Sequence, residues 1–183
     1  MTEPEPTKKI SELAPTTTEE YELMDQLDVQ QILAEMKGDV LSEYIYAFCR
    51  VHKGKKVSEC GCKGKNVVVG ISWAGIKAIV HQLKNIDTEL VRIEEDENEF
   101  RAIVKVTHKD RNISVYGASQ QPRFSSRGEG RPTRDDFALA KVVSKAQRNA
   151  WRNLIPETVI SELVKKHLGW SECPTEINLE KEK

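Results

Sequence analysis

Apolar positions recur at near-helical spacing in the first part of the chain. The pattern begins after Thr18, stops at Gly38 and rests on Leu23, Leu27, Ile32 and Met36. We therefore expect a helix over this segment, acidic on its outer face and apolar on its inner face. The residues before it, 1–18, contain three prolines and several threonines and have no apolar period, so a disordered acidic tail is expected there.

Alternating and β-branched residues then replace the helical period. Glu43–Val51 is predicted as a strand, and Val57–Cys62 as its return strand across a basic turn at 52–56. Ser72 suits the N-cap of a short helix that carries Trp73 and Ile76. Further strands are predicted at 66–71, 88–94, 100–108 and 112–118.

The segment 135–168 returns to helical spacing and is interrupted near Pro156. One side of this predicted helix is apolar and can pack on a core; it carries Leu139, Val142, Val143, Ala146, Ala150 and Leu154. The element order indicates an α+β fold, an antiparallel meander sheet covered by helices and followed by a long basic C-terminal helix. We expect one domain over 19–170, made of a hairpin at 43–65 and a core at 66–168, with a disordered tail at 171–183.

The formal net charge of −1 conceals a strong segregation of charge along the chain. Residues 1–44 carry eleven acidic and three basic side chains, whereas residues 45–65 carry six basic and one acidic. Residues 101–171 carry fourteen basic and six acidic side chains. A basic middle between acidic ends is typical of an anion-binding body with charged tails, and scattered surface charge is the alternative.

The long helix concentrates this positive charge on one face. Lys141, Lys145, Arg148 and Arg152 are spaced four, three and four residues apart, which aligns them along one side. No acidic residue lies among them, so mutual repulsion would have to be relieved by a partner. A polyanion, above all nucleic acid, fits this face, and a solvated charged face is the alternative.

A second basic segment lies just before the long helix. The loop 119–134 is longer than most connections, and its composition is typical of a mobile or functional segment. Phe124 within it, and Tyr116 before it, could stack on unpaired bases, although Phe124 could equally anchor the loop in the core. The candidate nucleic-acid contacts outside the helix are Arg123, Arg127, Arg131 and Arg134 of this loop and Lys53, Lys55 and Lys56 of the earlier turn.

Four potential metal ligands lie in the predicted hairpin, namely Cys49, His52, Cys60 and Cys62. The two limbs of a hairpin would bring them together, and thiolates with an imidazole suit a tetrahedral zinc ion. The spacing matches none of the common zinc modules. A Cys49–Cys60 disulfide and free thiols therefore stay open as alternatives.

The sequence supplies no recognisable catalytic site. It contains neither a phosphate-binding loop of the Walker type nor a nucleophile motif. Asp135 and Asp136 fit the start of the long helix better than a catalytic metal site. We therefore expect a protein without enzymatic activity.

The segments GISWAGIKAIVHQL at 70–83, the strands over 88–118 and the helix at 137–156 together resemble single-strand DNA annealing proteins. That superfamily includes the eukaryotic Rad-fifty-two protein and the phage Erf- and RecT-like annealers. The resemblance covers about residues 66–160 and rests on a basic helix that follows three strands. It implies a ring of subunits in which Lys141, Lys145, Arg148 and Arg152 line a groove for one DNA strand. The hairpin with the Cys and His residues departs from the family pattern.

The leading hypothesis is an intracellular, cytoplasmic protein that binds single-stranded DNA, with or without strand annealing, in recombination, repair or replication. A first alternative is an RNA-binding or transcription-associated module with a zinc-pinned hairpin. A second is a metal-dependent nuclease, and a third is an adaptor whose basic face meets an acidic protein. No apolar run in the sequence approaches the ~20 residues of a membrane span.

Overall fold

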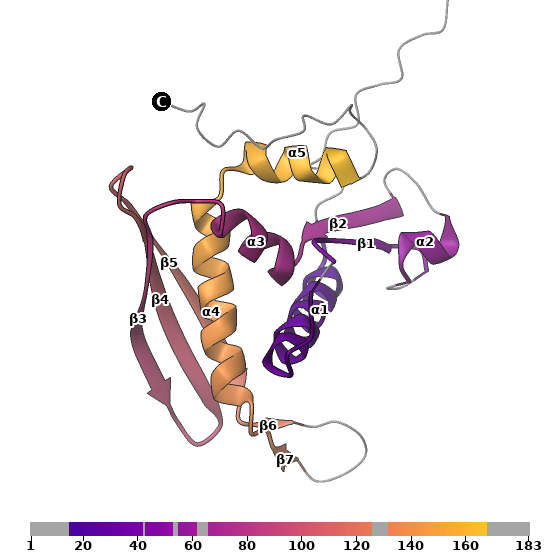
Figure 1. The fold of residues 1–183 in the computed structure, drawn as a ribbon. Helices are drawn as coiled ribbons and strands as arrows, with labels where there is room; N and C mark the ends of the chain where they lie inside the picture. Colours follow the sequence, from indigo (N-terminus) through magenta and orange to yellow (C-terminus); the bar gives the residue numbers. More distant parts are fainter. Residues whose placement is uncertain (1–14, 42, 53–54, 62–65, 126–131, 168–183) are drawn as a thin grey trace, which may run out of the picture.

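The computed structural model describes residues 15–41, 43–52, 55–61, 66–125 and 132–167, and its mixture of helices and antiparallel sheets confirms the α+β prediction (Figure 1). The helices are α1 (Thr18–Met36), α2 (Val57–Cys60), α3 (Trp73–Val80), α4 (Ala138–Leu154) and α5 (Glu157–His167). The strands are β1 (Ile45–Cys49), β2 (Val67–Ile71), β3 (Ile86–Glu95), β4 (Glu99–His108), β5 (Ile113–Pro122), β6 (Phe124–Ser125) and β7 (Thr133–Arg134).

Strands β3, β4 and β5 form the predicted antiparallel meander, in that order. Val106 of β4 lies opposite Thr88 on one side and Val115 on the other. The β3–β4 register shifts between Leu90 and Arg92, where a β-bulge interrupts the pairing. Alternate β4 residues, Ala102, Val104 and Val106, are buried, so one face of this sheet belongs to the core.

The predicted hairpin over 43–62 is wrong in its second limb. Residues 57–60 form the short helix α2, and β1 pairs instead with β2, which places Ala47 opposite Val69. The β2 segment VVVGI is far richer in β-branched residues than VSEC, so it is the better partner for a buried strand. Gly61 has a φ of 67°, the left-handed conformation in which a helix commonly ends.

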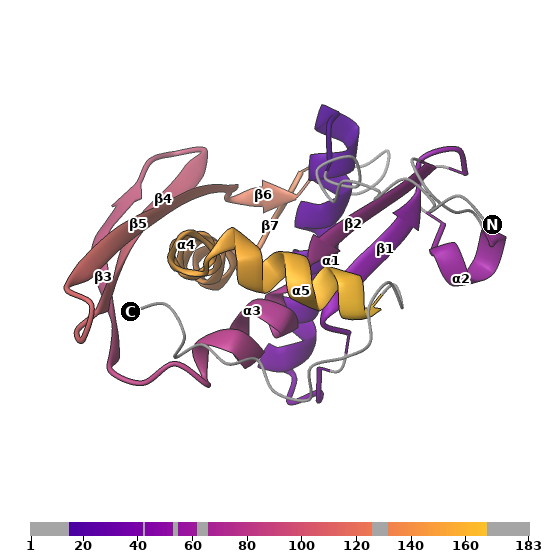
Figure 2. The ribbon, with the colours of Figure 1, turned by 90° about the horizontal axis from the view of Figure 1, so that it is seen from above.

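Helix α4 lies between the meander sheet and the other helices (Figures 1 and 2). The curved sheet covers one side of α4, while α1, α3, α5 and the β1–β2 pair lie on the other. Ala138, Ala146 and Ala150 are fully buried in α4, and these small side chains allow a close approach to β5. A Cβ atom on Gly117 of β5 would lie only 2.2 Å from the carbonyl oxygen of Ala146. Glycine is therefore required at this crossing.

Side chains of α1 and α4 satisfy backbone groups at the ends and edges of their neighbours. The carboxylate of Asp28 and the side-chain carbonyl of Gln31 accept hydrogen bonds from the first two N–H groups of α3, at 2.9 and 3.0 Å. Asn149 and Asn153 of α4 donate to the carbonyl oxygens of Ala118 and Tyr116, at 2.9 and 3.0 Å. The β5 edge away from β4 is thereby covered.

A predicted boundary also shifts at the loop before α4. Strand β5 continues to Pro122, four residues beyond the predicted end, and β6 pairs with β7. The predicted loop 119–134 is therefore partly strand. The predicted break at Pro156 is confirmed, because α4 ends at Leu154 and α5 begins at Glu157.

Candidate functional site

The four cations predicted to line one face of α4 all have acidic partners in the fold. The prediction that they form a row without counter-charges is therefore wrong. The nitrogen–oxygen distances are 2.6 Å for Lys141–Asp135, 2.8 Å for Lys145–Asp25, 2.6 Å for Arg148–Asp28 and 2.7 Å for Arg152–Glu157.

Lys141 differs from the other three because it is enclosed. It is only 7% exposed, and the Asp135 side chain that holds it is 10% exposed. Asp135 precedes α4 and also accepts a hydrogen bond from the backbone N–H of Phe137 at 3.1 Å. Lys141 thus stabilises the N-terminus of α4 and is not placed to contact a ligand.

The remaining cations, Lys145, Arg148 and Arg152, line a single cleft of about 480 Å³. Helix α4 supplies these three cations, α1 and α5 supply walls, and β2 supplies an apolar floor that includes Val69 and Ile71. The three partner acids line the same cleft, so its formal charges balance. The cleft can present fixed cations to an anionic ligand, but it is less positive than the sequence predicts.

Asp28 is the buried acid of the cleft, held by several polar neighbours. It is 3% exposed, and Oδ1 accepts hydrogen bonds from the Tyr46 hydroxyl at 3.1 Å and the Trp73 backbone N–H at 2.9 Å. Oδ2 lies 2.6 Å from Nε of Arg148, whose N–H is not aligned for a hydrogen bond. Burial raises the pKa of the Asp28 carboxyl, although Arg148 and the Trp73 N–H oppose this rise. Burial and the neighbouring Asp28 carboxylate likewise raise the pKa of Tyr46.

The other two acids of the cleft are open to solvent. The Asp25 side chain is 50% exposed and the Glu157 side chain is 76% exposed. Exposed ion pairs contribute only ~0–1 kcal/mol, so an incoming phosphate can replace either carboxylate at little cost. The acids of α1 were absent from the predicted site. The one signal that could have identified them is the excess of eleven acidic over three basic side chains in residues 1–44.

The predicted loop contacts are dispersed around β5, β6 and β7. Arg123 lies 5.3 Å from the Phe100 ring centroid, pairs with Glu95 at 2.9 Å and donates to the Asp96 carbonyl oxygen at 2.8 Å. Phe124 is 47% exposed, so it is not a core anchor. Tyr116 is 56% exposed and Arg134 is exposed in β7, whereas Arg127 and Arg131 lie outside the described residues.

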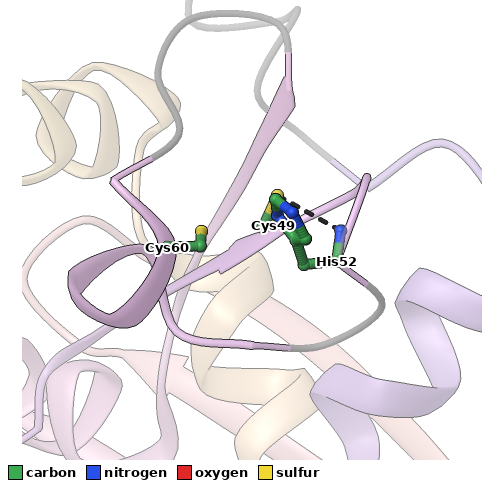
Figure 3. Close-up of side chains that lie close together, drawn as sticks. All are labelled: Cys49, His52 and Cys60. Carbon is green, nitrogen blue, oxygen red and sulfur yellow. Dashed lines mark hydrogen bonds between the residues drawn. The ribbon is translucent and has the colours of Figure 1, made fainter.

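Three of the four predicted metal ligands come together even though the predicted hairpin does not form. Figure 3 shows Cys49 at the end of β1, His52 in the following turn and Cys60 on α2. Their candidate ligand atoms all lie within 4.8 Å of one another. Within the described residues, no other group of three or more Cys, His, Asp or Glu side chains is placed to hold a metal ion. Cys62 lies outside the described residues.

The local hydrogen bonds favour metal ligation by this group. The Sγ atom of Cys49 lies 3.4 Å from Nδ1 of His52 and accepts the His52 backbone N–H at 3.4 Å. Cys49 is fully buried and Cys60 is partly buried. Cys49 and Cys60 are not joined to each other by a disulfide. A buried thiol beside a second thiol and an imidazole suits a thiolate-bound metal ion.

The basic turn follows Cys49 directly. Lys55 is exposed, and the Lys56 side chain, 55% exposed, pairs with Glu43 at 2.8 Å. Lys53 lies outside the described residues.

None of the described helices is long and apolar enough to span a membrane. In comparisons with known proteins, no family model and no curated protein matches this chain.

Proposed function

We propose that this chain binds single-stranded nucleic acid, DNA in the first instance, along the cleft between α1, α4 and α5. The observation that supports this proposal is the convergence of Lys145, Arg148 and Arg152 on that one cleft. Arg and Lys are the side chains best suited to phosphate, and their acidic partners hold them in place before a ligand arrives. Strand annealing, subunit rings and membership of the annealing superfamily remain parts of this proposal.

One exposed aromatic residue before α4 adds a way to hold an unpaired base. Phe124 on β6 is about half exposed, and an aromatic ring of this kind stacks on bases irrespective of sequence. Tyr116 lies on the face of the meander sheet turned away from α4 and is not part of this proposal. Arg134 pairs with Phe124 across the β6–β7 ladder and adds a cation beside it. These residues favour a single strand over a duplex, because bases in a duplex are already stacked on one another.

The test is fluorescence anisotropy of a labelled single-stranded oligonucleotide, titrated at several salt concentrations. The variant Lys145→Gln with Arg152→Gln should bind roughly tenfold more weakly, and its salt slope should fall by about 1.4, as expected for two lost phosphate contacts. Arg148 is left intact, because its removal would leave the buried Asp28 carboxylate without its cation.

A matched control removes two paired cations that do not line the cleft. Arg92 pairs with Glu94, and Lys109 pairs with Asp87 at 3.3 Å, so Arg92→Gln with Lys109→Gln changes the net charge equally. The control should bind almost as well as the natural chain. Equal losses of affinity in both variants would indicate a diffuse charge effect and would contradict binding in the cleft. RNA and duplex competitors, run in parallel, separate the single-stranded DNA proposal from the RNA alternative.

The second proposal concerns a cofactor. Cys49, His52 and Cys60, with Cys62 as a fourth ligand from the sequence, hold a structural zinc ion. Two thiols and an imidazole favour zinc over magnesium or calcium, which prefer oxygen ligands. Zinc analysis of the purified protein should give one equivalent per chain, and a chelated sample should recover that equivalent on addition of zinc. A protein that retains no zinc at neutral pH would contradict this assignment.

A further inference from the structure

We infer that the metal centre at Cys49, His52 and Cys60 fixes Lys55 and Lys56 as a second phosphate-binding surface, separate from the cleft. This inference rests on the proposed function for its ligand, single-stranded nucleic acid. The three candidate metal ligands come from one short segment that begins at the end of β1 and closes on α2 (Figure 3). Lys55 and Lys56 belong to the same segment.

Backbone hydrogen bonds couple the lysines directly to two of the metal ligands. The N–H of Cys49 donates to the carbonyl oxygen of Lys55 at 2.9 Å, and the N–H of Lys55 donates to the carbonyl oxygen of His52 at 3.1 Å. Lys56 forms an isolated bridge with Phe48, the residue before Cys49. An ion that fixes Cys49 and His52 therefore also fixes the backbone from which both lysines project.

Among the described residues, α2 makes little apolar contact with the rest of the fold. Helix α2 has four residues and none of them is buried. Val57 is only partly buried where it packs against the main core. Small elements with so little apolar burial are often stabilised by a bound metal, and the energy of metal binding then becomes folding energy. Removal of the ion should loosen α2 and the turn while the rest of the fold persists.

The charges of the segment suit phosphate once the ion is bound. Within the described part of this segment, Arg50 pairs with Glu20 at 2.7 Å, so Lys55 and Lys56 supply the positive charge beside the single acid Glu59. A zinc ion with three thiolates, Cys62 included, and a neutral imidazole has a net charge of −1, which the charges of Lys55 and Lys56 together exceed. The partner of Lys56, Glu43, is itself 43% exposed, and a phosphate can displace it cheaply. The lysines could instead serve only to stabilise the thiolates, and the experiment separates these two roles.

The first measurement tests the metal centre without nucleic acid. Cobalt added to the reduced, chelated full chain should give the thiolate-to-cobalt charge-transfer absorption and the strong visible bands of a tetrahedral site. Cys60→Ser should weaken or abolish this spectrum, whereas Cys173→Ser, which removes a cysteine outside the group, should leave it unchanged. A spectrum that is absent, or identical in Cys60→Ser, overturns the metal centre.

The second measurement tests the lysines. Lys55→Gln with Lys56→Gln should keep the cobalt spectrum and bind a single-stranded oligonucleotide roughly tenfold more weakly, with a salt slope lower by about 1.4. Lys84→Gln with Lys109→Gln, two exposed lysines distant in sequence from the centre, is the control and should bind normally. Zinc removal from the natural chain should weaken oligonucleotide binding to the same degree as the double substitution. In the Lys55/Lys56 variant, zinc removal should cause no further loss of affinity.

Each failure has a distinct signature. If zinc removal leaves oligonucleotide affinity unchanged, the coupling between metal and lysines is wrong even where the cobalt spectrum is present. If the Lys55/Lys56 variant loses the cobalt spectrum and regains affinity at saturating metal, the lysines act on the thiolates alone. If no form of the protein binds the oligonucleotide, the proposed function and the phosphate-binding surface fail together, while the cobalt spectrum still decides the metal centre.

Discussion

The Nε atom of Arg148 lies 2.6 Å from Oδ2 of Asp28, and this ion pair joins the basic helix α4 to the acidic helix α1. Other acids of the first 44 residues pair with later bases in the same way, at 2.7 Å for Glu20–Arg50 and 2.8 Å for Asp25–Lys145. Glu35 also pairs with Lys77. Much of the charge segregation along the chain is therefore used within the fold.

Arg148→Ala should destabilise the protein by about 3 kcal/mol at neutral pH, because it leaves the Asp28 carboxylate buried without its cation. Arg152→Ala is the control, since its partner Glu157 is 76% exposed and the loss should stay below ~1 kcal/mol. Urea unfolding at equilibrium measures both variants. Equal losses would show that the burial of Asp28 has no energetic consequence.

The raised pKa of Asp28 predicts a pH dependence that can be isolated with Asp28→Asn. Because the folded-state pKa lies above its ordinary value of 3.8, the stability from this carboxyl is complete below about pH 4 and is lost as the pH rises through the folded-state pKa. The unfolding free energy of the natural chain, relative to Asp28→Asn, should therefore fall as the pH rises above about 4.

A relative stability that grows with rising pH would mean that the attraction of Arg148 outweighs the burial of Asp28.

The comparison of the natural chain with Asp28→Asn cancels the contribution of Glu20, which titrates in both proteins. Burial alone would raise the pKa of Glu20, but its hydrogen bonds from Thr16 and Arg50 lower it on balance. Glu20 therefore contributes stability that is lost as the pH falls, opposite in sign to Asp28.

Gly117→Ala should destabilise the protein by about 1–3 kcal/mol, because the added methyl group would lie 2.2 Å from backbone atoms of Ala146 and Ala150. Backbone atoms cannot rotate away, so α4 must shift from the sheet. Ala118→Ser, at the next and exposed position of β5, should change the stability by less than ~0.5 kcal/mol. Thermal or urea unfolding compares them, and a stable Gly117→Ala variant would contradict the close packing of α4 on β5.

The sequence predicts most of the fold because its local signals agree with the tertiary packing. The alternation in 100–108 places Ala102, Val104 and Val106 on one face, and those side chains are buried against α4. Pro156 divides the last helix where expected, and Ser72 caps α3 by accepting the N–H of Gly75 at 3.0 Å. In each case the residue that carries the signal also makes the contact that stabilises the element.

The failures of prediction arise where a distant partner decides the outcome. The strand partner of β1 is β2 rather than the nearer 57–62, a choice that depends on the burial of Val67, Val68 and Val69. The charges of Lys145 and Arg148 are offset by acids more than a hundred residues earlier. Spacing along one helix cannot reveal such partners. The sequence therefore predicts that the cations share one face of the helix, but not that acidic side chains pair with them.

Removal of the exposed acids of the cleft should strengthen nucleic-acid binding if the cations there contact phosphate. Asp25→Asn with Glu157→Gln frees Lys145 and Arg152 from their exposed partners and keeps the buried pair of Arg148 intact. We expect affinity for a single-stranded oligonucleotide to rise several-fold at low salt, with a steeper salt slope than that of the natural chain.

Asp87→Asn with Glu94→Gln is the matched control, because these acids pair with Lys109 and Arg92, which do not line the cleft. This control variant has the same change in net charge, so its affinity for the oligonucleotide should rise by a smaller factor, through long-range attraction alone. If both double variants gain equally, the cleft has no special role in binding. If only the Asp25/Glu157 variant gains, α1 and α5 hold the phosphate-binding cations by occupying them with carboxylates that a nucleic-acid strand can displace.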